Sequence, residues 1–224
     1  MPKNSFPRLV IFDMAGTTVQ DQGEVPAAFT AALSQQGISV TPDQLNAVRG
    51  ASKRQAVLNL MPEGPDRLTR AEQAYAAFKT DLAWRFSESV QAVPGAEQTF
   101  NWLRKQGVKV ALNTGFDREI TDLLLNALQW SAGVVDAVAC GDEVRLGRPA
   151  PFLIFRCLEL TETQSVHDVA VVGDTALDLQ AAYNAGSKWN IGVLSGAHSR
   201  EKLEREPRTH LIPSVADLPE ILSV

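Results

Sequence analysis

Residues 8–18 have the sequence RLVIFDMAGTT, a short run of β-forming apolar residues that ends at Asp13 and passes into a turn. In an open parallel sheet, ligands gather at the carboxyl ends of the strands, so a carboxylate here would face a ligand. Gly16 allows a tight turn after Asp13, and we expect the following backbone N–H groups to bind phosphate oxygens. Taken alone, the motif also fits an Asp that only caps a helix.

The pattern of an apolar run followed by a helical segment recurs along the rest of the chain. Apolar runs occupy residues 108–112, 134–139, 168–173 and 189–194, and helical patterns occupy residues 96–107, 118–128, 151–160 and 177–186. Gly107 is expected to end the first of these helices as its C′ glycine. Apolar strands that alternate with helices are typical of a parallel sheet covered on both faces. We therefore predict a doubly wound α/β core.

Residues 20–92 interrupt this alternation, because they contain no convincing strand. Residues 41–44, Thr-Pro-Asp-Gln, have the pattern of a capping box with proline at the first helical position. Apolar residues further on follow helical spacing and predict a long amphipathic helix: Ala71, Ala74, Tyr75, Phe78, Leu82 and Phe86. We predict that residues 20–92 form a small helical cap domain, and that residues 1–19 and 93–224 form the core domain.

Composition excludes several classes of function. The net charge is −5 and no basic run is present, so the chain lacks the electrostatic footprint of a nucleic-acid-binding protein. Cys140 and Cys157 are not in a ligand spacing, which predicts two reduced thiols. The N-terminal apolar run is too short for a signal peptide or a membrane span, so we expect a cytoplasmic protein without a membrane partner. Among the histidines, only His198 follows a predicted strand at the expected active-site edge.

Polar residues follow two more of the predicted strands. Thr114 lies just beyond the second strand, where its hydroxyl could bind a phosphoryl oxygen or simply cap the next helix. Asp174 and Asp178 follow a later strand, and two carboxylates four residues apart beside a third make an oxygen-rich site suited to Mg²⁺. Each motif alone is weak. Together, Asp13, Thr114 and Asp174 at three strand ends predict a single site for phosphate and metal.

This order of motifs resembles the haloacid dehalogenase superfamily, over nearly the whole chain, and the helical insert resembles the first cap type of that superfamily. The resemblance implies that Asp13 is a nucleophile that forms an aspartyl-phosphate and that Thr114 binds the phosphoryl group. The superfamily's third motif, a Lys or Arg before proline, is matched by Arg148. Arg148 would offset the charge of the attacking carboxylate and of the phosphoryl oxygens.

The same resemblance implies a magnesium site. Its ligands would be the carboxylates of Asp13 and Asp174 and the backbone carbonyl of Ala15, with Asp178 in support. Catalysis would then consist of positioning and charge neutralisation around the phosphoryl group.

Ala15 bears on the type of reaction. Phosphatases of this superfamily usually carry Asp two residues after the nucleophile, where it protonates the leaving alkoxide. A missing general acid costs roughly 10²–10⁴ in rate when the leaving group is poor. A phosphonate has a carbanion as its leaving group, and a lysine that condenses with a neighbouring aldehyde forms an iminium that accepts those electrons. Ala15 thus favours carbon–phosphorus cleavage, and a weak phosphatase is the alternative.

Lys53, in the stretch RGASK at residues 49–53, is the candidate lysine. Here the chain resembles the phosphonatase branch of the superfamily, the phosphonoacetaldehyde hydrolases. The matching pieces are Asp13-Met-Ala-Gly-Thr-Thr, Gly50-x-x-Lys53, Thr114-Gly115-Phe116, Gly147-Arg148-Pro149 and Gly173-Asp174-Thr175-x-x-Asp178. The alanine after the nucleophile and the spaced lysine are the specific parts of this match.

Burial is expected to lower the pKa of Lys53, and Arg49 would add to this effect if the helix begun at Thr41 continues through both. The alternatives are a solvated lysine and a basic residue that only contacts the distal end of the substrate. The chain departs from the phosphonoacetaldehyde hydrolases at Arg49 and Ala56, where they usually carry Met and His. The missing His removes a proton shuttle, and Arg49 adds positive charge. These departures indicate either a different, more anionic substrate or loss of the phosphonatase step.

The leading hypothesis is therefore Mg²⁺-dependent hydrolysis of a small phosphonate through an aspartyl-phosphate and a Lys53 Schiff base. The second is a phosphomonoesterase acting on a small organic phosphate such as phosphoglycolate. A binding protein without turnover is disfavoured, because every expected catalytic residue type is present. The resemblance also allows a homodimer formed through the cap. The expected substrate contacts are Thr114, Gly115, Arg49 and Gly16.

Overall fold

The computed structural model describes residues 6–88, 90–130 and 133–222 of the 224-residue chain. Its centre is a six-stranded sheet with the order β3-β2-β1-β4-β5-β6, in which all neighbouring strands are parallel. The strands are β1 (Leu9–Asp13), β2 (Lys109–Asn113), β3 (Ala137–Ala139), β4 (Val169–Gly173), β5 (Trp189–Val193) and β6 (His210–Ile212). The chain order reverses between β1 and β4, so the switch point, where such sheets bind ligands, lies beside β1.

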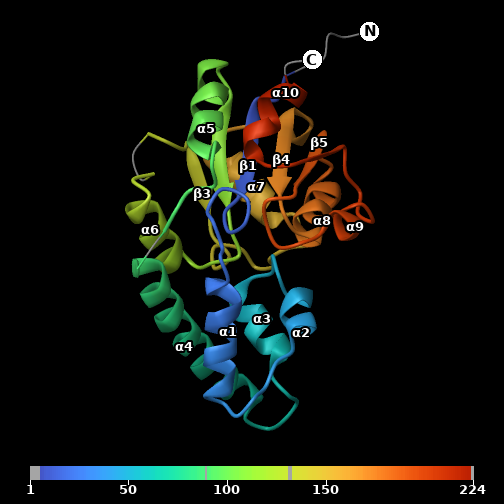
Figure 1. Ribbon diagram of the computed structural model, residues 1–224. Helices are drawn as coiled ribbons and strands as arrows, with labels where there is room; N and C mark the ends of the chain where they lie inside the picture. The colour runs from blue at the N-terminus through green and yellow to red at the C-terminus, as the bar shows by residue number, and fades with distance from the viewer. Residues whose placement is uncertain (1–5, 89, 131–132, 223–224) are drawn as a thin grey trace.

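Helices cover both faces of this sheet (Figure 1). Phe12 of β1 points to one face, where its ring lies 5.2 Å from that of Phe100. Its neighbour Ile11 points to the other face and packs into a cluster that contains Leu153 and Ala182. The helices of this part are α5 (Ala96–Lys105), α6 (Arg118–Ala127), α7 (Phe152–Leu160), α8 (Ala176–Ala185), α9 (Arg200–Leu203) and α10 (Leu218–Leu222), with 3-10 turns at Val166–Asp168 and Val215–Asp217. The predicted doubly wound α/β core is confirmed.

Four helices lie together beyond the carboxyl end of β1, at the lower end of Figure 1. They are α1 (Glu24–Ser34), α2 (Pro42–Ala47), α3 (Lys53–Leu60) and α4 (Arg67–Glu88). The predicted capping box at Thr41 and the predicted long helix are both present. Phe78 of α4 packs against Phe29 of α1 with ring centroids 4.4 Å apart. The division of the chain into a cap domain and a core domain stays a prediction.

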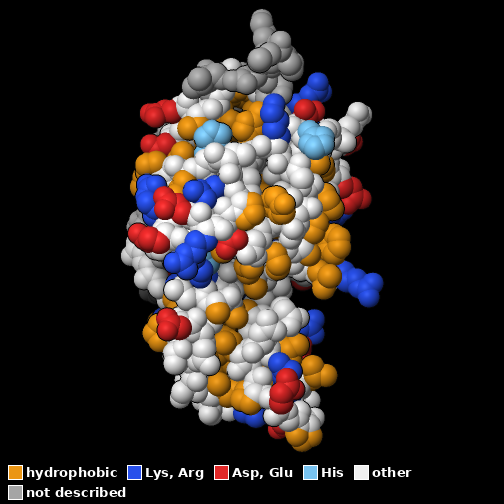
Figure 2. Space-filling model, turned by 90° about the vertical axis from the view of Figure 1, so that its right-hand side faces the viewer, with side chains coloured by type: hydrophobic (Ala, Val, Ile, Leu, Met, Phe, Trp, Pro, Cys, Tyr) orange, Lys and Arg blue, Asp and Glu red, His pale blue; other side chains and the backbone are white. Residues whose placement is uncertain are grey.

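Two connections join these four helices to the sheet side by side. The backbone N–H of Gln20 donates to the carbonyl of Gln91 at 2.9 Å, and that of Val93 donates to the carbonyl of Thr18 at 2.8 Å. The chain therefore leaves the sheet and returns to it at one point. In Figure 2, the outline of the molecule narrows between the larger upper part and the smaller lower part that carries these helices.

A second contact ties the four helices to the core through α4 and α6. The hydroxyl of Tyr75 donates to Oδ2 of Asp117 at 2.8 Å, and Asp117 also caps α6 through its other oxygen. Lys79 lies 3.4 Å from the same Asp117 carboxylate and 2.6 Å from that of Glu119. These polar contacts lie on the outer side of the junction.

The helix begun at Thr41 does not continue through Arg49 and Lys53, so the condition on which Arg49 was expected to act on Lys53 is not met. Helix α2 ends at Ala47, and α3 begins only at Lys53. Gly50, between them, has φ +84°, a left-handed conformation that breaks the helix. A side chain at Gly50 would also collide with Thr175 of the core. Arg49 therefore lies in a loop and not one helical turn from Lys53.

Other sequence predictions have mixed outcomes. Gly107 has φ +75° just after α5, as expected for a C′ glycine. Cys140 and Cys157 are free and buried. Strand β6 was not predicted, because its three residues, HLI, are too short to give a periodic signal. Within the described residues, no helix combines the length and hydropathy that crossing a membrane requires.

Candidate active site

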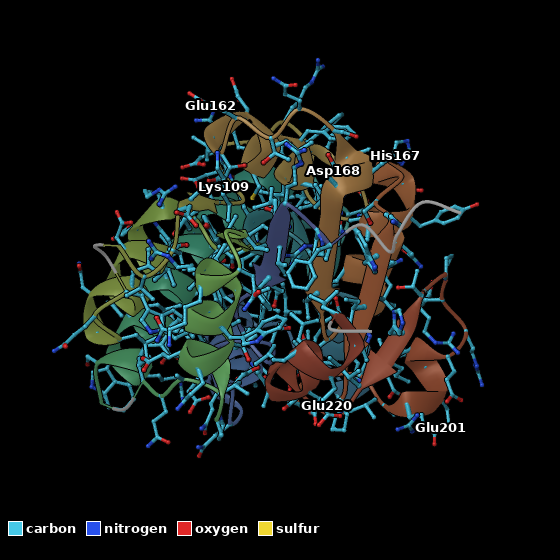
Figure 3. The ribbon with its side chains drawn as sticks, turned by 90° about the horizontal axis from the view of Figure 1, so that it is seen from above. Lys109, Glu162, His167, Asp168, Glu201 and Glu220 are labelled. Atoms are coloured by element: carbon cyan, nitrogen blue, oxygen red, sulfur yellow. The ribbon has the colours of Figure 1, made fainter. Side chains whose placement is uncertain are left out.

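Three strand ends bring the predicted site residues together. Asp13 ends β1, Thr114 follows β2, and Asp174 follows β4, and these three strands are neighbours in the sheet. Asp13, Asp174 and Asp178 are buried, and one carboxylate oxygen of each lies within 4.8 Å of the others. His167 precedes β4 and therefore lies at the amino-terminal ends of the strands, opposite the site. Figure 3 shows it beside Asp168.

Arg148 connects two of these carboxylates. Its Nη1 lies 2.7 Å from Oδ1 of Asp13, and its Nε lies 2.9 Å from Oδ1 of Asp178, with the arginine side chain 2% exposed. Its Nη2 donates to the backbone carbonyl of Asn113 at 3.0 Å and also to the side-chain oxygen of Asn113. The guanidinium is thus held on three sides, and it offsets part of the negative charge beside Asp13.

Asp174 is the carboxylate that Arg148 does not reach directly. Its donors among the described residues are neutral: the Thr17 hydroxyl at 3.0 Å and the Ala197 N–H at 2.6 Å. Two glycines leave room for it, since a Cβ at Gly16 would lie 2.5 Å from Asp174 Oδ2 and one at Gly196 would overlap the carboxylate. A buried, oxygen-rich cluster with one carboxylate lacking a cationic partner fits a divalent cation such as Mg²⁺ or Ca²⁺.

The pKa values of Asp13 and Asp174 are raised, in line with the excess of negative charge in this buried cluster. Burial, opposed by Arg148 and reinforced by Asp178, raises the pKa of Asp13 to about 6. Burial and the nearby carboxylates of Asp13 and Asp178 raise the pKa of Asp174 to about 8. A bound cation would favour the ionised form of each group and so lower both pKa values.

Both carboxylate oxygens of Asp178 bind partners within the protein. Its Oδ2 accepts the backbone N–H of Thr175 at 3.0 Å and the Thr175 hydroxyl at 2.5 Å, which completes the capping box of α8. Its Oδ1 faces Arg148. Because both oxygens have partners, Asp178 is placed to hold Arg148 and α8, and its part in a metal site stays a prediction.

Thr114 is oriented to donate a hydrogen bond. Its Oγ1 accepts the backbone N–H of Phe116 at 3.1 Å, so the hydroxyl proton is available for an oxygen in the pocket. The turn after Asp13 differs from expectation. The Gly16 N–H donates to the Val19 carbonyl at 2.7 Å, and the next three N–H groups donate to the Met14 carbonyl. The turn occupies the N–H groups of residues 16–19, and binding of phosphate oxygens by the N–H groups of Met14 and Ala15 stays a prediction.

Lys53 points into the same pocket as Asp13. Its side chain donates to the Ala51 carbonyl at 3.3 Å, and its Nζ lies 5.0 Å from the centre of the Phe116 ring. Burial lowers the pKa of Lys53, Asp13 opposes that change, and Arg148 adds to it. Arg148 is therefore a cation that lowers this pKa, whereas the sequence suggested Arg49 on the condition of one continuous helix.

The loop before Lys53 fits closely against the core. The N–H of Lys53 donates to the carbonyl of Gly115 at 3.0 Å. A Cβ at Gly115 would collide with the Ala51 carbonyl, and one at Gly147 would lie 3.1 Å from the Cβ of Ser52. Gly115 lines the pocket, as expected, and it also provides the space that this loop occupies.

The pocket has walls from both parts of the molecule. Its void measures about 510 Å³, including the open solvent at its mouth, and the cap side contributes Val25, Phe29, Leu45, Arg49 and Lys53. The core side contributes Asp13, Ala15, Thr114, Phe116, Asp174 and Ala197. The lining combines apolar side chains with charged and hydroxyl groups, as in sites that bind small molecules.

Two residues of the site escaped the sequence prediction. Asp21 lines the pocket and forms an ion pair with Arg49 at 3.2 Å, although 28 residues separate them. Asn113 holds Arg148, and its place at the end of a predicted strand was the signal that could have found it. His198 accepts the Ala176 N–H at 2.9 Å through Nδ1 and thus holds the start of α8 outside the pocket.

The chain is similar to known proteins in sequence and in fold. Residues 10–191 match the sequence model of the haloacid dehalogenase-like hydrolases. The phosphonoacetaldehyde hydrolase of Bacteroides fragilis is 31% identical over 218 residues, which cover 92% of this chain and 82% of the relative. The solved structure of a phosphonoacetaldehyde hydrolase-like protein from Oleispira antarctica superposes with a TM-score of 0.84 at 22% identity, covering 100% of this chain and 95% of that one. A structure named as a predicted phosphatase from Clostridium acetobutylicum superposes with a TM-score of 0.81 at 20% identity, covering 98% of this chain and 100% of that one.

Proposed function

Because this chain belongs to the haloacid dehalogenase-like hydrolase family, we propose that it is a phosphonatase-like hydrolase that cleaves the carbon–phosphorus bond of a small phosphonate. One observation carries the proposal. A buried lysine with a lowered pKa, Lys53, shares a pocket with Asp13, while the residue two positions after Asp13 is an alanine that cannot protonate an alkoxide.

The proposed metal is Mg²⁺, held by Asp13 and Asp174 with the Ala15 carbonyl as a further ligand. The support is the set of oxygen donors and the neutral partners of Asp174. When bound, Mg²⁺ would supply positive charge beside the phosphoryl oxygens. Asp178 acts through Arg148 and Thr175.

Asp13 is the proposed nucleophile. Its carboxylate attacks phosphorus, a new O–P bond forms, and the C–P bond breaks on the opposite side. The guanidinium of Arg148, 2.7 Å from Asp13, balances charge on the carboxylate and the phosphoryl oxygens. The hydroxyl of Thr114 donates to one phosphoryl oxygen, because its own oxygen already accepts from Phe116.

Lys53 accepts the electrons of the broken bond. Its neutral amine first adds to the substrate carbonyl, and uptake of one proton with loss of water leaves an iminium two bonds from phosphorus. The electron pair of the C–P bond then forms a carbon–carbon double bond, and the iminium becomes an enamine. Protonation of the enamine carbon and addition of water release the carbonyl product and the free amine. A second water hydrolyses the aspartyl-phosphate at Asp13 and releases phosphate.

Borohydride trapping tests this role of Lys53. The enzyme is incubated with phosphonoacetaldehyde, Mg²⁺ and borohydride, and peptide mass spectrometry locates any reduced adduct. We expect an adduct at Lys53 and phosphate release without borohydride. Lys53→Arg should lose both, whereas Lys105→Arg, at an exposed position at the end of α5, should keep both. Phosphate release that survives Lys53→Arg would contradict the Schiff-base route.

A phosphomonoesterase is the second candidate. It is favoured by Arg49 in the pocket wall and by the buried Ala56, which leaves no histidine beside Lys53 in α3. A panel of small phosphate esters, including phosphoglycolate, decides between the two. Ester hydrolysis that is fast and insensitive to Lys53→Arg, without cleavage of any phosphonate, would establish the esterase.

A further inference from the structure

Arg49 presents an incompletely paired guanidinium to the pocket. Its side chain is 25% exposed, and its Nη1 donates to Oδ2 of Asp21 at 3.2 Å. Among the described residues, this is the single hydrogen bond that the Arg49 side chain makes. A guanidinium has five N–H donors, so most of them remain available to a ligand in the pocket.

Asp21 cannot turn to meet Arg49 with both oxygens. Its Oδ1 accepts the backbone N–H groups of Gly23 at 3.1 Å and Val25 at 3.2 Å, which fixes the carboxylate at the start of α1. Asp21 is 5% exposed and therefore anchored, and it positions Arg49 through a single contact. Arg148 in the same site shows that one guanidinium can serve two carboxylates with separate nitrogens, at 2.7 and 2.9 Å.

A second cation, Lys202, lies near Arg49. Lys202 Nζ lies 2.8 Å from Nε2 of His198, and the pKa of His198 is lowered to about 4 by burial and then by Lys202 and Arg49. The pKa of Lys202 is also lowered, by burial and by Arg49, with Glu206 opposing. Besides burial, both lowered pKa values reflect the positive charge of Arg49 nearby, and Glu206 is the carboxylate that opposes it.

We propose that the substrate carries a carboxylate next to its reacting carbonyl, and that Arg49 binds this carboxylate with the nitrogens that Asp21 leaves free. The inference rests on the proposed function of the site. It names the substrate class as phosphonates of 2-oxo acids, of which 2-oxo-3-phosphonopropanoate is the smallest. The planar fork of arginine matches a carboxylate, which a methionine at this position could not do.

The chemistry balances with water as the only co-reactant. Lys53 condenses with the 2-oxo group and releases water, and attack of Asp13 on phosphorus breaks the bond to carbon 3. The electron pair forms the enamine, a proton is added at carbon 3, and hydrolysis yields pyruvate and phosphate. The carboxylate keeps its charge throughout, so Arg49 binds substrate and product alike.

The test compares kcat/KM for 2-oxo-3-phosphonopropanoate and phosphonoacetaldehyde in four proteins. Wild type should prefer the acid by about 10- to 100-fold, the usual range for a hydrogen-bonded charged contact. Arg49→Met should abolish this preference by raising KM for the acid alone. Asp21→Asn keeps the oxygen that caps α1 and should lower KM for the acid. Arg54→Met, which removes an exposed arginine paired with Glu72, should leave both substrates unchanged.

If Arg49 binds the carboxylate, Arg49→Met and Asp21→Asn change the KM for the acid in opposite directions. If the ion pair is only structural, both variants lower kcat/KM equally for the two substrates. That equal loss, or a wild-type preference for the aldehyde, would overturn the inference. If Arg49→Met does not fold, Arg49→Lys keeps the charge without the fork and should lose most of the preference.

If neither phosphonate is cleaved, the proposed function fails, and calorimetric binding still decides the inference. In the presence of Mg²⁺, 3-phosphonopropanoate should bind more tightly than propylphosphonate, and Arg49→Met should remove the difference. Equal binding of the two by wild type would overturn the carboxylate site.

Discussion

Asp174 is the residue on which the acidic centre depends, because its described hydrogen-bond donors carry no charge. Asp13 and Asp178 share Arg148, so their charges are partly balanced inside the protein. Asp174 remains a buried anion that burial and neighbouring carboxylates disfavour. A bound cation would therefore favour its ionised form.

The first prediction concerns pH and metal. The pKa values of Asp13 and Asp174 rise from their ordinary value of 3.8 to about 6 and about 8 in the metal-free fold. Raised pKa values mean that these groups stabilise the fold at low pH and that this contribution is lost as pH rises through about 8. Metal-free protein should therefore melt at a lower temperature at pH 8 than at pH 5. Mg²⁺ at about 100 times its Kd should restore roughly 5–10 °C at pH 8 and much less at pH 5.

Thermal melts with EDTA or with Mg²⁺ at the two pH values measure this effect. Asp174→Asn is the informative variant, because an amide cannot ionise and should remove most of the pH dependence and of the response to Mg²⁺. A Mg²⁺ effect of equal size at both pH values would contradict competition between protons and the ion.

The second prediction concerns the nucleophile. Asp13→Asn keeps the size of the side chain but removes the attacking oxygen anion, so phosphate release should fall by about 10³-fold or more. Mass spectrometry of acid-quenched enzyme should detect a phosphoryl group on wild type and none on the variant. Asp43→Asn, an exposed change in the first turn of α2, provides the matched control and should leave turnover intact.

At the scale of elements, the loop of residues 48–52 decides where Lys53 lies. Gly50 combines a left-handed backbone with a close approach to Thr175, the residue that caps α8 and holds Asp178. The loop thus connects the wall that carries Lys53 to the acidic centre. A change at Gly50 acts on both sides of the site.

The third prediction follows from this loop. Gly50→Ala should lower the free energy of unfolding by more than the roughly 1–2 kcal/mol that a left-handed alanine costs, because its Cβ also meets Thr175. It should reduce kcat/KM as well, since Lys53 moves with the loop. Gly37→Ala is the matched control, because Gly37 has φ +71° and a Cβ added there would have no described atom within 4 Å.

Chemical denaturation and steady-state kinetics of both variants measure the two effects. Gly37→Ala should lose stability and keep its activity. Equal losses of activity in the two variants would show that the fit against Thr175 does not matter.

The elements were predictable where a local pattern determines them. Apolar runs that end in Asp13 or Asp174 indicated β1 and β4, and the capping box at Thr41 indicated α2. Strand β6 and the break at Gly50 were missed for different reasons. A three-residue strand has no measurable period, and a single glycine inside a helical pattern is compatible with either a helix or its end.

At the scale of the whole molecule, the site needs contacts between distant segments that no local pattern reveals. The pairing of Asp21 with Arg49 depends on how α1 and the loop before α3 meet. Likewise, a cation that acts on Lys53 is Arg148, which follows it by 95 residues in the sequence. The residue types of the site could be predicted, whereas the partners of each residue required the fold.

The fourth prediction concerns the junction of α4 and α6. Tyr75→Phe removes the hydrogen bond to Asp117, worth about 0.5–1.5 kcal/mol, and should weaken the closed arrangement of the helical insert on the core. We expect KM to rise several-fold with a smaller change in kcat, because the acidic centre is untouched. Tyr183→Phe, at a site 66% exposed, is the control for the lost hydroxyl. A selective fall in kcat would instead tie Tyr75 to the chemical step.

Gly50, Gly115 and Gly147 let the two parts of the molecule fit closely, because an added Cβ at the first two would collide with the other part and one at Gly147 would lie 3.1 Å from its nearest atom. Under the proposed mechanism, we expect such a fit to slow the entry of substrate and the exit of product. We also expect each catalytic cycle to include an opening of the two parts, whose rate depends on the viscosity of the solvent. The kcat of a fast substrate should therefore fall as glycerol raises the viscosity of the medium. The kcat of a slow substrate should not fall, because the chemical step limits it.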